Sequence, residues 1–123
     1  MLIHHVSFQC ADYAAATAFY DAVLAPLGAG RVMEIPGHAV AYGLAGGPEL
    51  WLGPLEIGDG FREAHIAFTA PSREAVDAFF AAAEAAGAEI LHRPRLWPEY
   101  RPTYYGAFVR DPDGNNVEAV CMD

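Results

Sequence analysis

The chain has 123 residues, enough to bury the core of one compact domain, and its formal net charge is −9. This charge argues against nucleic acids and anionic membranes as partners, and the absence of lysine excludes Schiff-base and P-loop chemistry. No apolar run reaches the roughly 18 residues of a membrane span and no signal peptide opens the chain, so a cytoplasmic protein is expected.

The first half of the chain predicts one strand, one helix and three further strands. A strand is expected over 2–10, and alternation places His5, Ser7 and Gln9 together on one of its faces. Asp12 is a typical N-cap of the following helix, and Pro26 with Gly28 ends it. Short strands separated by Gly- and Pro-containing turns are then expected at 31–35, 38–44 and 49–52.

The second half predicts the same order of elements after a glycine-containing linker at 54–63. A strand at 64–69 precedes a helix that Ser72 caps and Gly87 ends. A strand at 88–92, a long loop at 93–103 and strands at 104–110 and 115–121 follow, with an Asp-Pro-Asp-Gly turn between the last two. Cys10 and Cys121 each belong to an apolar strand and are expected to be reduced core residues.

The two halves also repeat each other in sequence. Shifting the chain by sixty residues places His5-Val6-Ser7-Phe8 on His65-Ile66-Ala67-Phe68. The expected fold is therefore α+β, with two paired βαβββ modules, 1–53 and 64–123, inside one domain spanning 1–123. Each sheet is expected to pack one face on its helix and to curl the other inward around a cavity.

The inward faces predict a metal site. His5 and His65 occupy equivalent positions of the repeat, and Glu118 is a carboxylate in an otherwise apolar strand. Two imidazoles and one carboxylate suit a divalent Zn, Ni, Co, Mn or Fe ion and leave positions open for substrate. Two alternatives stay open: each histidine serves only as a hydrogen-bonding residue, or Glu118 pairs with Arg110 across the turn.

The repeat also indicates whether the first module supplies a fourth metal ligand equivalent to Glu118. Glu118 lies four residues after Gly114, and the position four residues after the matching Gly47 is Trp51, which cannot bind a metal. Glu49 takes that place only if the strand register slips by two residues. His4, His38 and His92 have no partners at matching positions and are expected to be peripheral.

Several of these segments resemble the vicinal oxygen chelate superfamily, which includes glyoxalase I, bleomycin-resistance proteins and extradiol dioxygenases. The matching segments are His5-Val6-Ser7-Phe8, Ala18 to Leu24, His65-Ile66-Ala67-Phe68 and Phe108 to Glu118 with its Asp-Pro-Asp-Gly-Asn turn. The resemblance implies the paired-module fold, metal ligands at His5, His65 and Glu118, and frequent dimerisation. The resemblance implies that glyoxalase I enzymes have a carboxylate ligand at about the position of Trp51. Because this chain has a tryptophan there, it departs from the family pattern, and this argues against glyoxalase I activity itself.

The cavity predicted from this resemblance has lining residues on both modules. Alternation along the strands gives Ser7, Gln9, Trp51, Ala67 and Thr69. The aromatic loop adds Trp97, Tyr100, Arg101 and Tyr104, and two roles stay open for it: closing over a flat ligand, or packing under the second sheet. Glu99 is a candidate base only if it reaches the metal, so the catalytic residues are not assigned.

Two functions follow from these expectations, and a degenerate member of the superfamily with no activity stays open as a third possibility. The first is a metal-dependent lyase, isomerase or dioxygenase of the glyoxalase type, acting as a homodimer on a small substrate that chelates through adjacent oxygens. The second is a metal-free, bleomycin-resistance-type protein that binds a cationic aromatic molecule in an aromatic groove.

Overall fold

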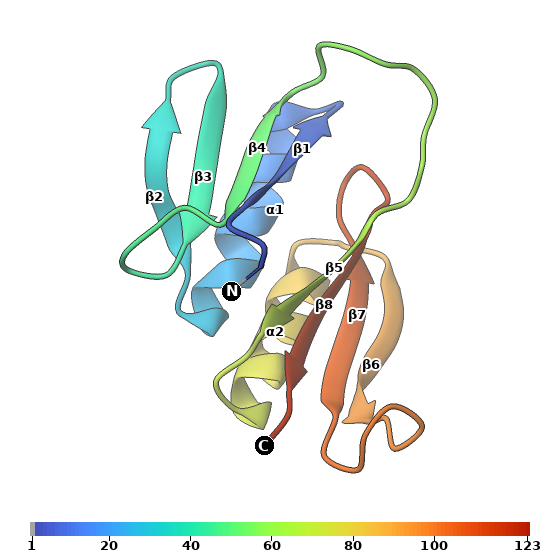
Figure 1. Cartoon of the computed structure of the whole chain (residues 1–123). Helices are drawn as coiled ribbons and strands as arrows, with labels where there is room; N and C mark the ends of the chain where they lie inside the picture. Colours follow the sequence, from blue (N-terminus) through green and yellow to red (C-terminus); the bar gives the residue numbers. More distant parts are fainter. Residues whose placement is uncertain (1) are drawn as a thin grey trace.

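A computed structural model describes residues 2–123 and confirms an α+β fold of two βαβββ modules (Figure 1). The first module contains β1 (Val6–Cys10), α1 (Tyr13–Leu24), the short 3-10 helix η1 (Ala25–Leu27), β2 (Gly30–Ile35), β3 (Ala39–Gly43) and β4 (Leu50–Pro54). The second contains β5 (His65–Thr69), α2 (Arg73–Ala85), β6 (Ile90–Leu96), β7 (Tyr105–Arg110) and β8 (Asn116–Cys121). A long segment arches from β4 to β5 and connects the modules (Figure 1).

Each module contributes one mixed four-stranded sheet. The strand orders are β1-β4-β3-β2 and β5-β8-β7-β6, so the two sheets have the same topology. The first strand of each module pairs in parallel with the last strand, and the remaining pairs are antiparallel. This order places the residues of β1 beside β4 and those of β5 beside β8, where the candidate ligands lie.

The helices begin and end at the residues expected from the sequence. The side chain of Asp12 accepts a hydrogen bond from the amide of Ala15 at 3.0 Å, and Ser72 accepts one from Ala75 at 3.1 Å. Gly87 follows α2 with a φ of 80°, a left-handed conformation that glycine adopts without steric penalty.

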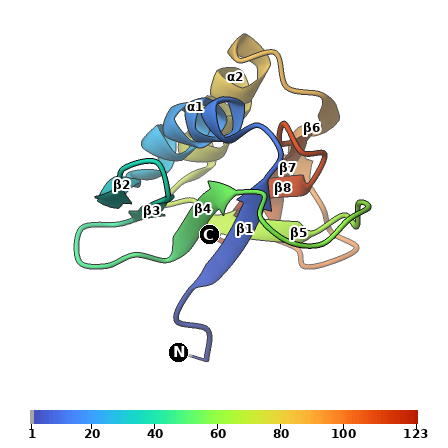
Figure 2. The same cartoon turned by 90° about the horizontal axis from the view of Figure 1, so that it is seen from above.

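The two helices contact one another and lie on the same side of the molecule (Figure 2). Their apolar faces and the helix-facing sides of both sheets form one core, which includes Phe19, Val23, Val76, Phe79 and Val109. The opposite sheet faces expose side chains along β1 and β5. Over residues 2–123 the sheets do not show the expected inward curl, and a common cavity, within one chain or between two, stays a prediction.

Two strand boundaries differ from the sequence prediction by more than two residues. The first strand begins at Val6 rather than Leu2, because its partner β4 begins at Leu50, opposite Val6, and the preceding residues have no neighbour. The segment expected to be a loop from residue 93 instead continues β6 to Leu96. This strand lies at the edge of its sheet, where Pro94 is tolerated, and its register shifts between His92 and Arg95.

Both cysteines are buried and free, as expected for core residues. Burial raises the pKa of the Cys10 thiol to about 12, and the nearby charges of Asp113 and Asp111 act in the same direction. A thiol with this pKa is unreactive at neutral pH. None of the helices within residues 2–123 has the length and apolar character needed to cross a membrane.

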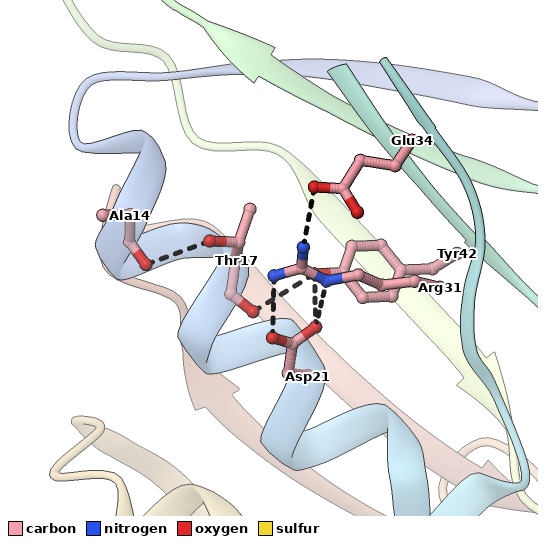
Figure 3. Close-up of polar contacts among 6 residues, drawn as sticks. All are labelled: Ala14, Thr17, Asp21, Arg31, Glu34 and Tyr42. Carbon is pink, nitrogen blue, oxygen red and sulfur yellow. Dashed lines mark hydrogen bonds and ion pairs between the residues drawn. The ribbon is translucent and has the colours of Figure 1, made fainter. Parts of the chain in front are cut away.

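A network of polar side chains attaches β2 and β3 of the first sheet to α1 (Figure 3). The Arg31 guanidinium donates two hydrogen bonds to the Asp21 carboxylate, both at 2.9 Å. The buried Tyr42 hydroxyl contacts the same carboxylate at 2.8 Å and the carbonyl oxygen of Thr17 at 3.1 Å. β2 is exposed along its whole length, so these contacts replace part of the core packing that it lacks.

This network predicts an acid-dependent contribution to stability. Hydrogen bonding from Arg31 holds the pKa of Asp21 below its usual value. The ion pair therefore stabilises the protein above the unfolded-state pKa of about 3.9, and that contribution disappears as the pH falls through the lower folded-state pKa. Because both side chains are more than a third exposed, Arg31→Ala is expected to cost at most about 1 kcal/mol at pH 7.

Urea unfolding of Arg31→Ala and wild type between pH 7 and about pH 2 measures this effect. The difference in free energy of unfolding is expected to shrink below about pH 4. Arg62→Ala, in the exposed linker, controls for the loss of an arginine charge. A difference for Arg31→Ala that stays constant across this range would contradict the assignment.

Candidate metal centre on the open sheet faces

His65 and Glu118 lie together on the open face of the second sheet. Residue 65 starts β5 and Glu118 is in the middle of β8, and the strand register places Glu118 beside Ala67. The His65 Nε2 atom lies 2.9 Å from Glu118 Oε1. Glu118 is 2% exposed while the imidazole is 49% exposed, so the histidine connects a buried carboxylate with the surface. Arg110 pairs with Glu63 and Glu89 instead, so the alternative partner for Glu118 is wrong.

A third residue completes the surroundings of Glu118. The hydroxyl of Tyr104, which lies just before β7, donates a hydrogen bond to Glu118 Oε2. Burial and this hydrogen bond raise the pKa of Tyr104 above its ordinary value. The sequence placed Tyr104 only in a cavity lining, because its distance from Glu118 across the β7–β8 hairpin depends on register.

His5 is not part of this group within the chain. It lies immediately before β1, its side chain is exposed, and its Nδ1 atom is 2.9 Å from Nδ1 of His4. Within residues 2–123, no group of three or more His, Cys, Asp or Glu side chains is close enough to hold a metal ion. The structure therefore brings together two of the three candidate ligands in one chain.

The strand pairing supports the internal comparison between modules. Ser7 pairs with Trp51 in the first sheet, and its counterpart Ala67 pairs with Glu118 in the second. Trp51 therefore occupies the position equivalent to Glu118, as the repeat predicted. Glu49 precedes β4 and lies two residues from that position, so the register does not slip.

The candidate lining residues that lie on strands are divided between two cavities. A cavity of about 510 Å³ on the open face of the first sheet is lined by His5, Ser7, Gln9 and Trp51. The Gln9 side chain already has hydrogen-bond partners within the chain, because its Oε1 accepts hydrogen bonds from the amides of Glu56 and Ile57. A second cavity of about 400 Å³ between the modules contacts His5, Ala67 and Thr69.

The aromatic loop packs on the second sheet. Trp97 is 6% exposed, and its indole nitrogen donates to the carbonyl oxygen of Gly106 at 3.0 Å. Tyr100 stacks on Trp97 at a centroid distance of 5.8 Å and remains 59% exposed. Trp97 thus has a packing role, whereas Tyr100 and the exposed Arg101 stay available as lining residues.

The donor atoms of His65 and Glu118 fit a divalent ion. Metal–nitrogen and metal–oxygen bonds of about 2.1 Å that meet at a right angle span about 3.0 Å, close to the observed 2.9 Å. Imidazole nitrogen and carboxylate oxygen are also the donors that Zn, Ni, Co, Mn and Fe accept. The same contact serves as a hydrogen bond without metal, so geometry alone admits both states.

Comparison with known proteins identifies the family. The model of the Glyoxalase/Bleomycin resistance protein/Dioxygenase superfamily matches residues 2–119. The chain belongs to this superfamily. Among proteins with curated functions, none matches the chain.

Solved structures of the superfamily share the fold along the whole chain. A glyoxalase/bleomycin resistance protein from Albidiferax ferrireducens T118 is 28% identical with a TM-score of 0.84, over 98% of this chain and 99% of that one. A lactoylglutathione lyase from Agrobacterium tumefaciens is 26% identical with a TM-score of 0.68, over 97% and 92% of the two chains. The paired-module fold predicted from the sequence is therefore the fold of these proteins.

Proposed function

We propose that this chain is a divalent-metal-dependent enzyme of the glyoxalase type, a lyase, isomerase or dioxygenase that acts on a small molecule with adjacent oxygens. The observation that supports this proposal is the 2% exposed Glu118 carboxylate, which faces His65 on an otherwise accessible sheet face. A buried carboxylate is costly without a cation or hydrogen-bond donors, and a metal site provides a reason to retain it.

We propose further that two chains complete the site. His5 of one protomer would join His65 and Glu118 of a second, because one chain brings only the latter two together. The open face of the first sheet exposes the apolar side chains of Met33 and Ile35, and the following linker exposes Ile57; a partner would cover all three. Ile35 and Ile57 line the same cavity as His5, so the apolar surface and the third ligand adjoin.

In such a site the bound ion would act as a Lewis acid toward the substrate oxygens. The residues of the chain would provide binding and orientation. His65 and Glu118 would hold the ion through Nε2 and Oε1, the burial of Glu118 would keep water from its carboxylate, and Tyr104 would hold a proton at its hydroxyl against Oε2. Trp51 at the position equivalent to Glu118 argues against glyoxalase I activity itself, although a lactoylglutathione lyase is among the similar structures.

Metal content tests this proposal. Wild-type protein purified without chelator, then stripped and titrated with Co²⁺ or Zn²⁺, is expected to bind one ion per chain. His65→Ala is expected to weaken binding by at least about 100-fold, since it removes a ligand rather than an outer-shell partner. His92→Ala removes an exposed imidazole whose ring packs on Trp97 and Phe108, and it is the matched control. No bound metal in wild type, or equal affinity in His65→Ala, would reject the proposal.

One observation favours the metal-free binding protein as a second candidate. Both oxygens of Glu118 already have partners in His65 and Tyr104, so the carboxylate is satisfied without a cation. In that case the accessible ring of Tyr100 would contact an aromatic or cationic ligand. Tight binding of such a ligand by chelator-treated protein, without turnover, would distinguish this function from the first.

A further inference from the structure

Gly106 in β7 leaves the space that Glu118 and Tyr104 occupy. A Cβ atom at this position would lie 3.3 Å from Glu118 Oε2, 3.3 Å from Tyr104 Cε1 and 3.4 Å from the carbonyl oxygen of Ala119. Its φ is not positive, so the backbone does not require glycine here. The constraint at this position is therefore steric: a Cβ atom would fit only if the carboxylate, the tyrosine ring or the neighbouring strand gave way by a few tenths of an ångström.

The ring of Tyr104 is itself held in place. Tyr100 contacts it edge to face at 5.2 Å, and Tyr100 stacks on the buried Trp97. The indole nitrogen of Trp97 in turn donates a hydrogen bond to the carbonyl oxygen of Gly106. Tyr104 is thus fixed between an aromatic stack on one side and the open position of Gly106 on the other.

The two oxygens of Glu118 consequently have different neighbours. Oε1 faces the imidazole of His65, and Oε2 accepts the hydrogen bond from Tyr104. A carboxylate can ligate a metal with one oxygen or with both. Because Oε2 accepts the hydrogen bond from Tyr104, only Oε1 faces the place between His65 and Glu118 that a metal ion would take.

We propose that Tyr104 is a positioning residue that restricts Glu118 to one metal-binding oxygen, and that Gly106 makes this arrangement sterically possible. This inference rests on the proposed metal-dependent function. It assigns to Tyr104 and Gly106 the selection of coordination number, and through it the number of positions left open for substrate.

Spectroscopy of Co²⁺-loaded, full-length protein tests the proposal. Removing the hydroxyl in Tyr104→Phe frees Oε2 to join the ion, so the visible absorption bands of Co²⁺ are expected to shift and lose intensity as the coordination number rises. Affinity for Co²⁺ is expected to fall by roughly 10- to 100-fold, as for other outer-shell partners of a ligand. Tyr105→Phe removes the hydroxyl of the next residue, which donates to Asp77 of α2 rather than to Glu118, and is expected to leave spectrum and affinity unchanged.

Gly106→Ala gives a second, steric test. It is expected to change the Co²⁺ spectrum while Tyr104 is intact, with circular dichroism and urea unfolding confirming that the variant is folded. If Tyr104→Phe binds Co²⁺ with the spectrum and affinity of wild type, the positioning role is rejected although the metal site stands. If wild type itself binds no Co²⁺, the proposed function fails, and the positioning role fails with it.

Discussion

Asp111→Ala is expected to reduce the free energy of unfolding by roughly 3–5 kcal/mol, the largest loss of stability predicted for this chain. Single domains are typically stable by about 5–15 kcal/mol, so this loss would remove a large share of the stability of the protein. Urea unfolding followed by circular dichroism measures the change.

The expected size follows from the contacts of one buried carboxylate. Asp111 is 6% exposed and accepts hydrogen bonds from the Tyr20 hydroxyl at 2.8 Å and the Asp113 amide at 3.0 Å. It also accepts bonds from the backbone and side-chain nitrogens of Asn115, at 2.9 and 3.1 Å. Each buried donor left without a partner costs about 1–3 kcal/mol. Tyr20 belongs to α1, so this carboxylate also connects the two modules.

Two variants separate this role from a general effect of losing an acidic residue. Asp59→Ala lies in the exposed linker and is expected to change stability by less than about 0.5 kcal/mol. Tyr20→Phe removes only the hydroxyl and is expected to cost about 1–3 kcal/mol. Equal unfolding midpoints for Asp111→Ala and Asp59→Ala would show that the buried network contributes nothing.

The fold could be predicted from the sequence because its signals are local and repeated. Helix caps at Asp12 and Ser72, the glycine after α2 and the alternation in β1 and β5 all reflect interactions between residues close in the chain. The boundaries that failed depend on distant partners. β1 could not extend to residue 2 because β4 begins opposite Val6, and β6 continued through Pro94 because it lies at a sheet edge.

The candidate site, like the fold, was predictable where neighbouring strands bring residues together and not where contacts depend on distant side chains. The contact between His65 and Glu118 follows from register, since the first and last strands of a module are neighbours. For Asp111 the sequence predicted only a turn. Its hydrogen bond with Tyr20 was not predicted, because the two residues lie 91 positions apart in the chain. The role of Gly106 was not detected, since it depends on the position of two side chains from other segments. The repeat and the family resemblance both group His5 with His65, and module equivalence does not specify which chain supplies each module.

A mixture of two inactive variants can decide that question, and it is expected to restore metal binding. His5→Ala and Glu118→Gln are each expected to lose at least about 100-fold in affinity for Co²⁺. When the two are unfolded together and refolded as an equimolar mixture, about one quarter of the wild-type Co²⁺ sites are expected to return. Random pairing gives about half heterodimers, and each heterodimer contains one intact site out of two.

The gain arises only if His5 and the His65–Glu118 pair of one site belong to different chains. A mixture of His65→Ala and Glu118→Gln is the matched control, because both ligands lie in the second module and no pairing of these chains places both in one site. That mixture is expected to bind no more Co²⁺ than its components. If the first mixture also shows no gain while wild type binds Co²⁺, all ligands come from one chain, and His5 must reach Glu118 by a rearrangement of the modules.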